Sequence, residues 1–343
     1  MIVRSKAPLR LGLAGGGTDV SPYSEMHGGL VLNATIDRYA YCTIEARDGA
    51  VEYNAPDVGR RIELPLADAL ITNATHLPLH HSVYRRVMRE FNNGIPLPLR
   101  VTTYSDVPAG SGLGSSSTLV VAMVRAFVEL LNIPIGDYEI ANLAYEIERV
   151  DVGLSGGKQD QYAATFGGFN FIEFHTDGMV VVNPLRVKDW VRNELENSIL
   201  LFFTGTSRSS AVIIDDQISR TAKGDIDTLA GMHDLKESAT AMKACLLRGD
   251  FEGFAKCLRD GWRAKKLTSR SISNPQIEEL YSFVLARGGT AAKISGAGGG
   301  GFMMIVCDPV RRYELIAQLE SRGDGYVVPV AFIEKGAEAW TLR

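Results

Sequence analysis

The stretch Pro108-Ala-Gly-Ser-Gly-Leu-Gly-Ser-Ser-Ser117 places three glycines and four serines directly before residues 118–131, which are nearly all apolar. An apolar segment of that length predicts a largely buried helix. A loop of small residues that opens a helix offers unpaired backbone N–H groups and the positive end of the helix dipole, which suit a phosphate. Serine hydroxyls could add hydrogen bonds or bind Mg²⁺. A glycine-rich turn before a serine-capped helix explains the stretch equally well.

Two common phosphate-binding motifs do not explain this stretch. The stretch has no Lys at the place where a GxxxxGK[ST] loop requires one. No GxGxxG opens the first strand–helix crossover, which disfavours a dinucleotide-binding oxidoreductase. A phosphate site here would therefore belong to another class of protein.

Two further glycine clusters occur, at residues 14–19 (AGGGTD) and 296–301 (GAGGGG). Either one alone is better explained as a tight bend or a turn, with Asp19 as a helix cap. Three such loops in one chain are harder to explain without a ligand between them, because glycine carries an entropic cost on folding.

The rest of the chain predicts an α+β fold. We expect strands at residues 28–47, 98–104, 166–174, 302–307 and 326–333. We expect helices at residues 137–150, 229–247, 251–267 and 276–286, the first of them capped by Asp137. Long amphipathic helical segments dominate the chain after about residue 195, which predicts two domains, 1–195 and 196–343.

Composition narrows the class of protein. The chain has 343 residues, 45% of them hydrophobic and 22% charged, as expected for a compact protein of two domains. A net charge of −4 without a Lys/Arg run disfavours nucleic-acid binding. Four scattered cysteines suggest neither a zinc site nor disulfides, which fits a reducing cytoplasm. No signal peptide and no apolar run of membrane-spanning length is expected.

The three glycine clusters together resemble the motifs of the GHMP small-molecule kinases in order and spacing. The matching stretches are Ala7-Pro-Leu-Arg10 followed by Gly-Gly-Gly-Thr-Asp19, the stretch 108–117, and Lys293-Ile-Ser-Gly-Ala-Gly-Gly-Gly-Gly301. The first motif looks most like that of the heptose-phosphate kinases, with fucokinase-type domains as near relatives. The resemblance implies an N-terminal domain of the ribosomal-S5 type and a ferredoxin-like C-terminal domain, with ATP and the acceptor sugar between them.

The resemblance also assigns roles to single residues. It implies that the ATP phosphates are held by Pro108, Gly110, Ser111, Gly112, Leu113, Gly114, Ser115 and Ser116. It implies that Ser116 and Glu148 bind Mg²⁺, although a Glu on a helix is most often a solvated surface charge. It makes Asp160 the base that accepts the acceptor proton, where the alternative is a cap on a helix starting at Gln161. Arg10 would stabilise charge on the transferring phosphoryl group.

For the acceptor site, the resemblance points to Asp19, which would bond sugar hydroxyls, and to Gly16, Gly17, Thr18, His27 and Gly298. Galactokinases carry Glu-His where this chain has Gly16 and Gly17, so a longer or phosphorylated sugar is expected. Arg208, Lys265 and Lys266 are candidates for holding a substrate phosphate. His27 has a structural role as its alternative, and the two lysines have ordinary surface charge.

The resemblance implies ATP- and Mg²⁺-dependent transfer of a phosphoryl group to the anomeric hydroxyl of D-glycero-D-manno-heptose 7-phosphate, giving the 1,7-bisphosphate. A fucokinase or another hexose-1-kinase is the alternative within the family. A non-catalytic sugar- or nucleotide-binding regulator is the alternative from another class. The sequence indicates small-molecule partners and leaves the oligomeric state open.

Overall fold

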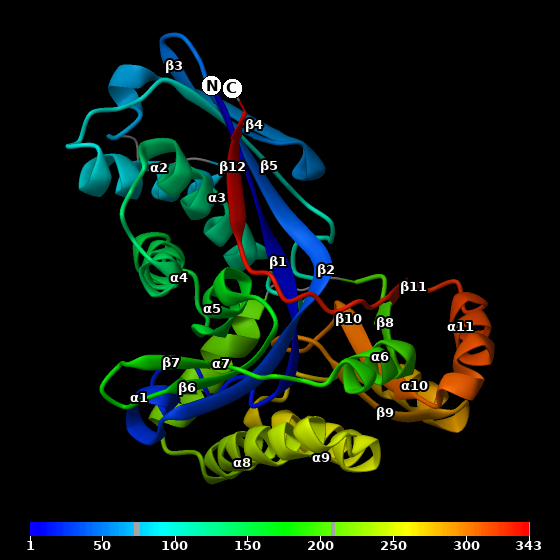
Figure 1. The fold of residues 1–343 in the computed structure, drawn as a ribbon. Coiled ribbons are helices and arrows are strands. Elements are labelled where there is room, and N and C mark those ends of the chain that lie inside the picture. Colours follow the sequence, from blue (N-terminus) through cyan, green and yellow to red (C-terminus); the bar gives the residue numbers. More distant parts are fainter. Residues whose placement is uncertain (72–75, 207–209, 343) are drawn as a thin grey trace.

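The computed structural model describes residues 1–71, 76–206 and 210–342, which form two sheets with their covering helices (Figure 1). In these ranges the first sheet has eight strands in the order β12-β1-β2-β5-β3-β4, with β6 paired to β2 and β7 paired to β6. Its strands are β1 (Ile2–Ala14), β2 (Gly29–Ala46), β3 (Ala50–Ala55), β4 (Arg60–Pro65), β5 (Leu99–Ser105), β6 (Phe169–Phe174), β7 (Val180–Pro184) and β12 (Glu338–Leu342).

Strand β2 changes partner along its length. Residues 29–34 pair with β6, whereas residues 40–46 pair with β5, and β1 follows β2 on its other edge. The alternating pattern at residues 28–47 therefore predicted a strand correctly. Because β1 and β2 run together through the molecule, the end of β1 at Ala14 brings the first glycine cluster to the middle of the fold (Figure 1).

The second sheet is antiparallel in the order β11-β8-β10-β9. Its strands are β8 (Ile199–Phe203), β9 (Gly289–Ile294), β10 (Phe302–Cys307) and β11 (Tyr326–Pro329). The expected strand at 326–333 is too long. It ends at Pro329, which has no backbone N–H, and Phe332 instead forms a bridge with Ile36 of the first sheet.

The expected helices are present, with two corrections. The described helices are α1 (Tyr23–His27), α2 (Pro78–Phe91), α3 (Ser115–Leu131), α4 (Asp137–Glu146), α5 (Gln159–Phe166), α6 (Asp189–Ser198), α7 (Ser210–Ala222), α8 (Ile226–Arg248), α9 (Phe251–Thr268), α10 (Pro275–Ala286) and α11 (Arg312–Glu320). Asp137 does not cap α4, because Gly136 holds that position and donates its N–H to Glu139 at 3.1 Å. The predicted helix over 137–150 changes to a π-helical turn at Ile147–Asp151.

The two sheets share one hydrophobic core. Leu9 and Leu11 of β1 pack in the same cluster as Leu201 of β8, Met242 of α8 and Phe254 of α9. A second cluster lies between the first sheet and helices α2 and α3, and a third lies under α10 and α11. Packed apolar side chains from both sheets therefore support the region where β1 ends.

The chain returns to the first sheet at its end. Strand β12 pairs with β1 from Ile2↔Leu342 to Lys6↔Glu338, and the two chain ends lie together (Figure 1). The domain boundary at 195/196 stays a prediction.

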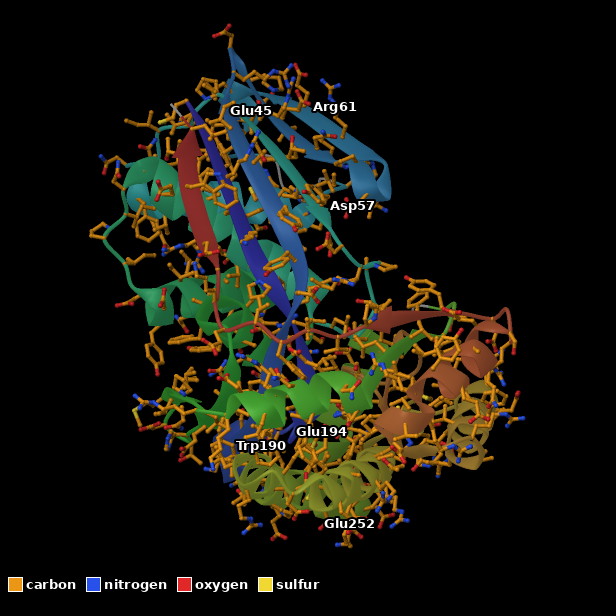
Figure 2. The ribbon with its side chains drawn as sticks, turned by 45° about the vertical axis from the view of Figure 1, so that its right-hand side comes forward. Glu45, Asp57, Arg61, Trp190, Glu194 and Glu252 are labelled. Carbon is orange, nitrogen blue, oxygen red and sulfur yellow. The ribbon has the colours of Figure 1, made fainter. Side chains whose placement is uncertain are left out.

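Glu45 and Arg61 lie at one end of the first sheet and Glu252 at the opposite end of the molecule, while Trp190 and Glu194 lie on α6 (Figure 2). Trp190 packs its ring 6.0 Å from that of Phe251. No helix in the described ranges has both the length and the apolarity that a membrane crossing requires.

Candidate active site

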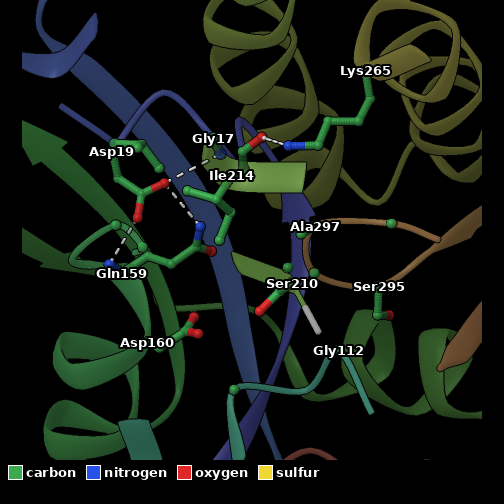
Figure 3. Close-up of a pocket in the computed structure, with 18 of the residues that line it drawn as sticks. Gly17, Asp19, Gly112, Gln159, Asp160, Ser210, Ile214, Lys265, Ser295 and Ala297 are labelled. Atoms are coloured by element: carbon green, nitrogen blue, oxygen red, sulfur yellow. Dashed lines mark hydrogen bonds between the residues drawn. The ribbon is translucent and has the colours of Figure 1, made fainter. Parts of the chain in front are cut away.

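All three glycine clusters contribute to one cavity of about 320 Å³. Its walls come from the end of β1 and the following loop, the loop before α3, the turn before α5, faces of α7, α8 and α9, and the loop between β9 and β10 (Figure 3). A cavity of this size fits a small-molecule site.

The second and third glycine clusters pack backbone against backbone. Phe302 donates its N–H to the Ser111 carbonyl at 2.9 Å. Gly112 has φ +83°, and a Cβ there would come within 2.4 Å of the Ser295 carbonyl oxygen. Glycine is thus required for the approach of two loops, beyond any need to admit a ligand.

The loop before α3 exposes only part of its sequence to the cavity. Gly110, Gly112, Gly114, Ser115 and Ser116 line it, as predicted for a phosphate-binding loop. Three of the expected ATP-binding residues do not. Pro108 is exposed outside the cavity, Ser111 is fully buried, and Leu113 belongs to the core beneath the loop.

Arg10 and Asp160 form an ion pair inside the cavity. Nε and Nη2 of Arg10 lie 2.6 Å from Asp160 Oδ1, and Nη1 donates to the Gly112 carbonyl at 2.8 Å. Arg10 is 4% exposed, whereas the Asp160 side chain is 18% exposed, so the carboxylate faces the cavity from a fixed position. Arg10 is therefore not the surface charge that a strand residue would suggest.

Asp160 is not a helix cap. Helix α5 begins one residue earlier, at Gln159, and the carboxylate of Asp19 accepts the Gln159 N–H at 3.0 Å. Asp19 also accepts from the Gln159 side chain at 3.0 Å and from the Gly17 N–H at 3.2 Å (Figure 3). Three of its roughly four acceptor positions are thereby filled, so Asp19 mainly joins the first glycine loop to α5.

Glu148 and Ser116 meet as the resemblance implied. The Ser116 hydroxyl donates to Glu148 Oε1 at 2.7 Å, and the Gln161 amide donates to Oε2 at 2.7 Å. Glu148 is 1% exposed while Ser116 is exposed, so this Glu is no solvated surface charge. A carboxylate and a hydroxyl are hard oxygen donors of the kind that Mg²⁺ prefers, and Mg²⁺ takes few protein ligands. The residues present fit that ion.

The acceptor-side predictions have mixed outcomes. Gly16, Gly17 and Gly298 line the cavity. Thr18 does not, because it is fully buried with its hydroxyl bonded to the Gly15 carbonyl at 2.8 Å and to the Leu30 N–H at 3.0 Å. It fixes the loop rather than touching a ligand.

Two other acceptor candidates lie away from the cavity lining. His27 packs 5.0 Å from the His233 ring, and burial and the nearby charges of His233 and Lys236 lower its pKa. Lys266 is bonded to Glu278 at 3.0 Å. Arg208 lies outside the described residues.

Two lysines enter the cavity instead. Lys265 is 7% exposed and donates to the Gly16 carbonyl at 3.1 Å (Figure 3). Burial lowers its pKa to about 8, partly opposed by Asp19. Lys293 donates to the carbonyls of Gly12 at 2.8 Å and Leu13 at 3.3 Å. Burial, followed by the charges of Lys265 and Arg10, lowers the pKa of Lys293 to about 7.

Sequence reasoning missed several lining residues. Lys293 opens the third motif, three residues before its first glycine, but the resemblance assigns it no role. Arg149 follows Glu148, donates to the Ser117 hydroxyl at 3.2 Å and lines the cavity. Gln159 flanks Asp160 but carried no signal in the sequence, because its role depends on the distant Asp19.

Comparisons with known proteins agree with this geometry. The family described as GHMP kinases N terminal domain matches residues 78–168, and the one described as GHMP kinases C terminal matches residues 242–325. The chain is 46% identical to D-glycero-alpha-D-manno-heptose 7-phosphate kinase of Campylobacter jejuni, over 99% of both sequences.

A solved structure described as a D-glycero-D-manno-heptose 1-phosphate kinase from Bacteroides thetaiotaomicron superposes with a TM-score of 0.84. It is 45% identical, with 99% of each chain covered. A bifunctional fucokinase/GDP-fucose pyrophosphorylase of Arabidopsis thaliana is more distant, at 26% identity over 92% of this chain and 31% of its own length.

Proposed function

Because the chain belongs to the GHMP kinases, we propose that it transfers the γ-phosphoryl group of ATP to the anomeric hydroxyl of D-glycero-D-manno-heptose 7-phosphate. The product would be the 1,7-bisphosphate. The substrate is supported by the printed activity of the 46% identical relative, which spans 99% of both sequences. Fucose is a weaker candidate, since the fucokinase relative is only 26% identical.

The observation that carries the proposal is the meeting of three features in one cavity. They are the Arg10–Asp160 pair, the open N-terminus of α3 and the Ser116–Glu148 pair. Phosphoryl transfer needs positioning and charge stabilisation more than covalent chemistry, and these features supply both. A protein that only bound sugar or nucleotide would have no use for a fixed base.

We assign the proton to Asp160. The bond from the acceptor oxygen to the γ-phosphorus forms as the bond to ADP breaks, and the hydroxyl proton passes to the carboxylate. Arg10 keeps that carboxylate in place and ties it to the α3 loop through the Gly112 carbonyl. The base and the phosphate loop are therefore set relative to each other before any ligand enters.

Ser116 and Glu148 are the residues that would hold Mg²⁺. When bound, Mg²⁺ neutralises the charge that develops on the phosphate oxygens. Gln161 fixes the Glu148 carboxylate through its amide at 2.7 Å.

The test is ADP release with Mg-ATP and a panel of acceptors: heptose 7-phosphate, mannose 6-phosphate, fucose, galactose and no sugar. We expect turnover with the heptose 7-phosphate and little with fucose or galactose. Phosphorus NMR of the product should show a new anomeric phosphate. Turnover with fucose above that with the heptose would overturn the substrate assignment. ATP binding without turnover on any sugar would favour a regulator.

A second acceptor follows from the description of the Bacteroides thetaiotaomicron structure, which names a heptose 1-phosphate kinase. The panel therefore includes D-glycero-D-manno-heptose 1-phosphate. Turnover on this sugar alone would place the reaction at a hydroxyl other than the anomeric one, because the anomeric oxygen is already phosphorylated.

A further inference from the structure

We infer that Lys265 and Lys293 form an anion site for the phosphate that the acceptor already carries, away from the hydroxyl that reacts. The inference rests on the proposed function, because it takes a sugar phosphate as the acceptor. It gives a role to Lys293, which opens the third glycine-rich motif, and joins it to Lys265, which the sequence indicates as a candidate for holding a substrate phosphate.

Both ammonium groups lack an acidic partner. In the described part of the chain, no carboxylate oxygen lies within 4.0 Å of either Nζ, and their protein acceptors are backbone carbonyls alone. An ammonium has three N–H donors, of which Lys265 uses one and Lys293 uses two. Buried charges in proteins are normally paired. Both lysines line the cavity, so the partner that they lack can come from a ligand.

The two charges also act on each other. Lys265 donates to the Gly16 carbonyl and Lys293 to the carbonyls of Gly12 and Leu13, so both ammonium groups contact the same short stretch of chain at the cavity. The charge of Lys265 also helps to lower the pKa of Lys293. Asp19 acts on Lys265, but its carboxylate is already bonded to Gly17 and Gln159. A phosphate dianion between the lysines would relieve their repulsion and fill their free donors.

The position fits the far end of an acceptor. Lys293 is held by the carbonyls of residues 12 and 13, two to three residues along β1 from Arg10. In the proposed reaction the γ-phosphate lies beside Asp160, and Lys265 lies on the opposite side of the cavity from Asp160 (Figure 3). In a heptose 7-phosphate the anomeric hydroxyl and the phosphate are at opposite ends.

Gly17 keeps the Lys265 ammonium open to the cavity. A Cβ at position 17 would come within 2.9 Å of Lys265 Nζ, and this glycine has φ +108°. Gly17 is one of the two glycines that stand where galactokinases carry Glu-His. Because this chain has glycine there, space remains beside the Lys265 ammonium for a phosphate.

The test compares binding of heptose 7-phosphate and of unphosphorylated heptose by calorimetry, for the wild type, Lys265→Met and Lys293→Met. Lys266→Met is the matched control, since Lys266 is the next residue on α9, pairs with Glu278 and lies outside the cavity lining. We expect each cavity variant to bind heptose 7-phosphate about 10- to 100-fold more weakly, as for lost charged hydrogen bonds. Binding of heptose and of ATP should stay as in the wild type.

A thermal melt separates this role from a structural one. Replacing an ammonium that has no carboxylate partner with an apolar side chain should leave the melting temperature equal or higher, whereas a structural lysine would lower it on removal. Equal affinity of the wild type for both sugars would overturn the inference. So would unchanged heptose 7-phosphate binding in both cavity variants, or a loss confined to ATP.

Failure of the proposed function gives a different result. If no sugar supports ADP release, the anion site is judged with inorganic phosphate as the probe. Phosphate binding that is lost in Lys265→Met and Lys293→Met, and kept in Lys266→Met, would support the site for another phosphorylated acceptor. Equal phosphate binding by all four proteins would overturn it.

Discussion

Asp160 has a single ion-pair partner, Arg10, among the described residues, and its side chain is open to the cavity. We predict that Asp160→Asn lowers kcat by about 10²- to 10⁴-fold, the usual contribution of a general base, while ATP affinity changes little. Steady-state kinetics and ATP titration would measure both. Asp189→Asn, at a side chain that is 83% exposed, is the control. A kcat within threefold of wild type, roughly the precision of such comparisons, would remove Asp160 from the chemistry.

Glu148 should govern the response to Mg²⁺. Glu148→Gln keeps the size of the side chain but removes a hard anionic ligand, so the Mg²⁺ concentration for half-maximal activity should rise about tenfold or more. Activity measured across a Mg²⁺ titration checks this. Glu146→Gln, two residues earlier and 41% exposed, should behave as wild type. An unchanged Mg²⁺ requirement in Glu148→Gln would exclude Glu148 as a ligand.

Lys293 should make stability depend on pH in a defined direction. Its pKa falls from the ordinary 10.5 to about 7 in the folded protein, through burial and the charges of Lys265 and Arg10. Between about pH 7 and 10.5 the unfolded chain therefore binds more protons, so this lysine's destabilising effect is complete below pH 7 and fades as pH rises. Urea unfolding of Lys293→Met should show its largest gain over wild type near pH 7 and almost none near pH 10. A gain that grows with pH would contradict the prediction.

At the scale of elements, the glycine-rich loops pack against other loops as well as line the cavity. The loop before α3 meets the loop between β9 and β10 at Gly112 and Ser295, and Gly157 leaves room for the Asp19 carboxylate, which a Cβ would approach within 1.9 Å. The second and third clusters are therefore packed directly together, and the first is joined to the turn before α5 through Asp19. Ligand binding alone does not explain these glycines, because a Cβ at several of them would meet other protein atoms.

Gly112→Ala tests that support. The substitution combines φ +83° with a Cβ placed 2.4 Å from a backbone oxygen, so we expect a loss of about 3 kcal/mol or more in the free energy of unfolding. Gly94→Ala has φ +71° with nothing within 4 Å, and should lose only the conformational term of about 1–2 kcal/mol. Denaturant unfolding of both variants measures the difference. Equal losses would show that the loops can separate at little cost.

At the scale of the whole molecule, the shared core predicts that the two sheets unfold together. Leu11 of β1 is fully buried beside residues of β8, α8 and α9. Leu11→Ala should cost about 2–5 kcal/mol. In a Trp340→Phe background, tryptophan fluorescence comes from Trp190 and Trp262, both outside the first sheet. The fluorescence midpoint should shift with that of circular dichroism; two separated transitions would contradict a common core.

The sequence by itself determined several of the helices and strands and the three glycine-rich loops. Periodicity predicted β10 and nearly all of α3, α8, α9 and α10, because their apolar patterns are local properties. The resemblance of the sequence to the GHMP kinases predicted that Arg10, Ser116, Glu148 and Asp160 belong to one site, and all four line the cavity.

Tertiary structure decided the contacts between distant segments. Asp19 caps α5 from 140 residues away, Thr18 turns inward to hold its loop, and β12 returns to β1. Lys265 lines the cavity and Lys266 does not, because successive side chains on a helix point about 100° apart. Burial and the absence of an acidic partner are properties of the surrounding fold, which residue spacing does not encode. The lysines' lowered pKa values therefore appear only once α9 and β9 close against β1.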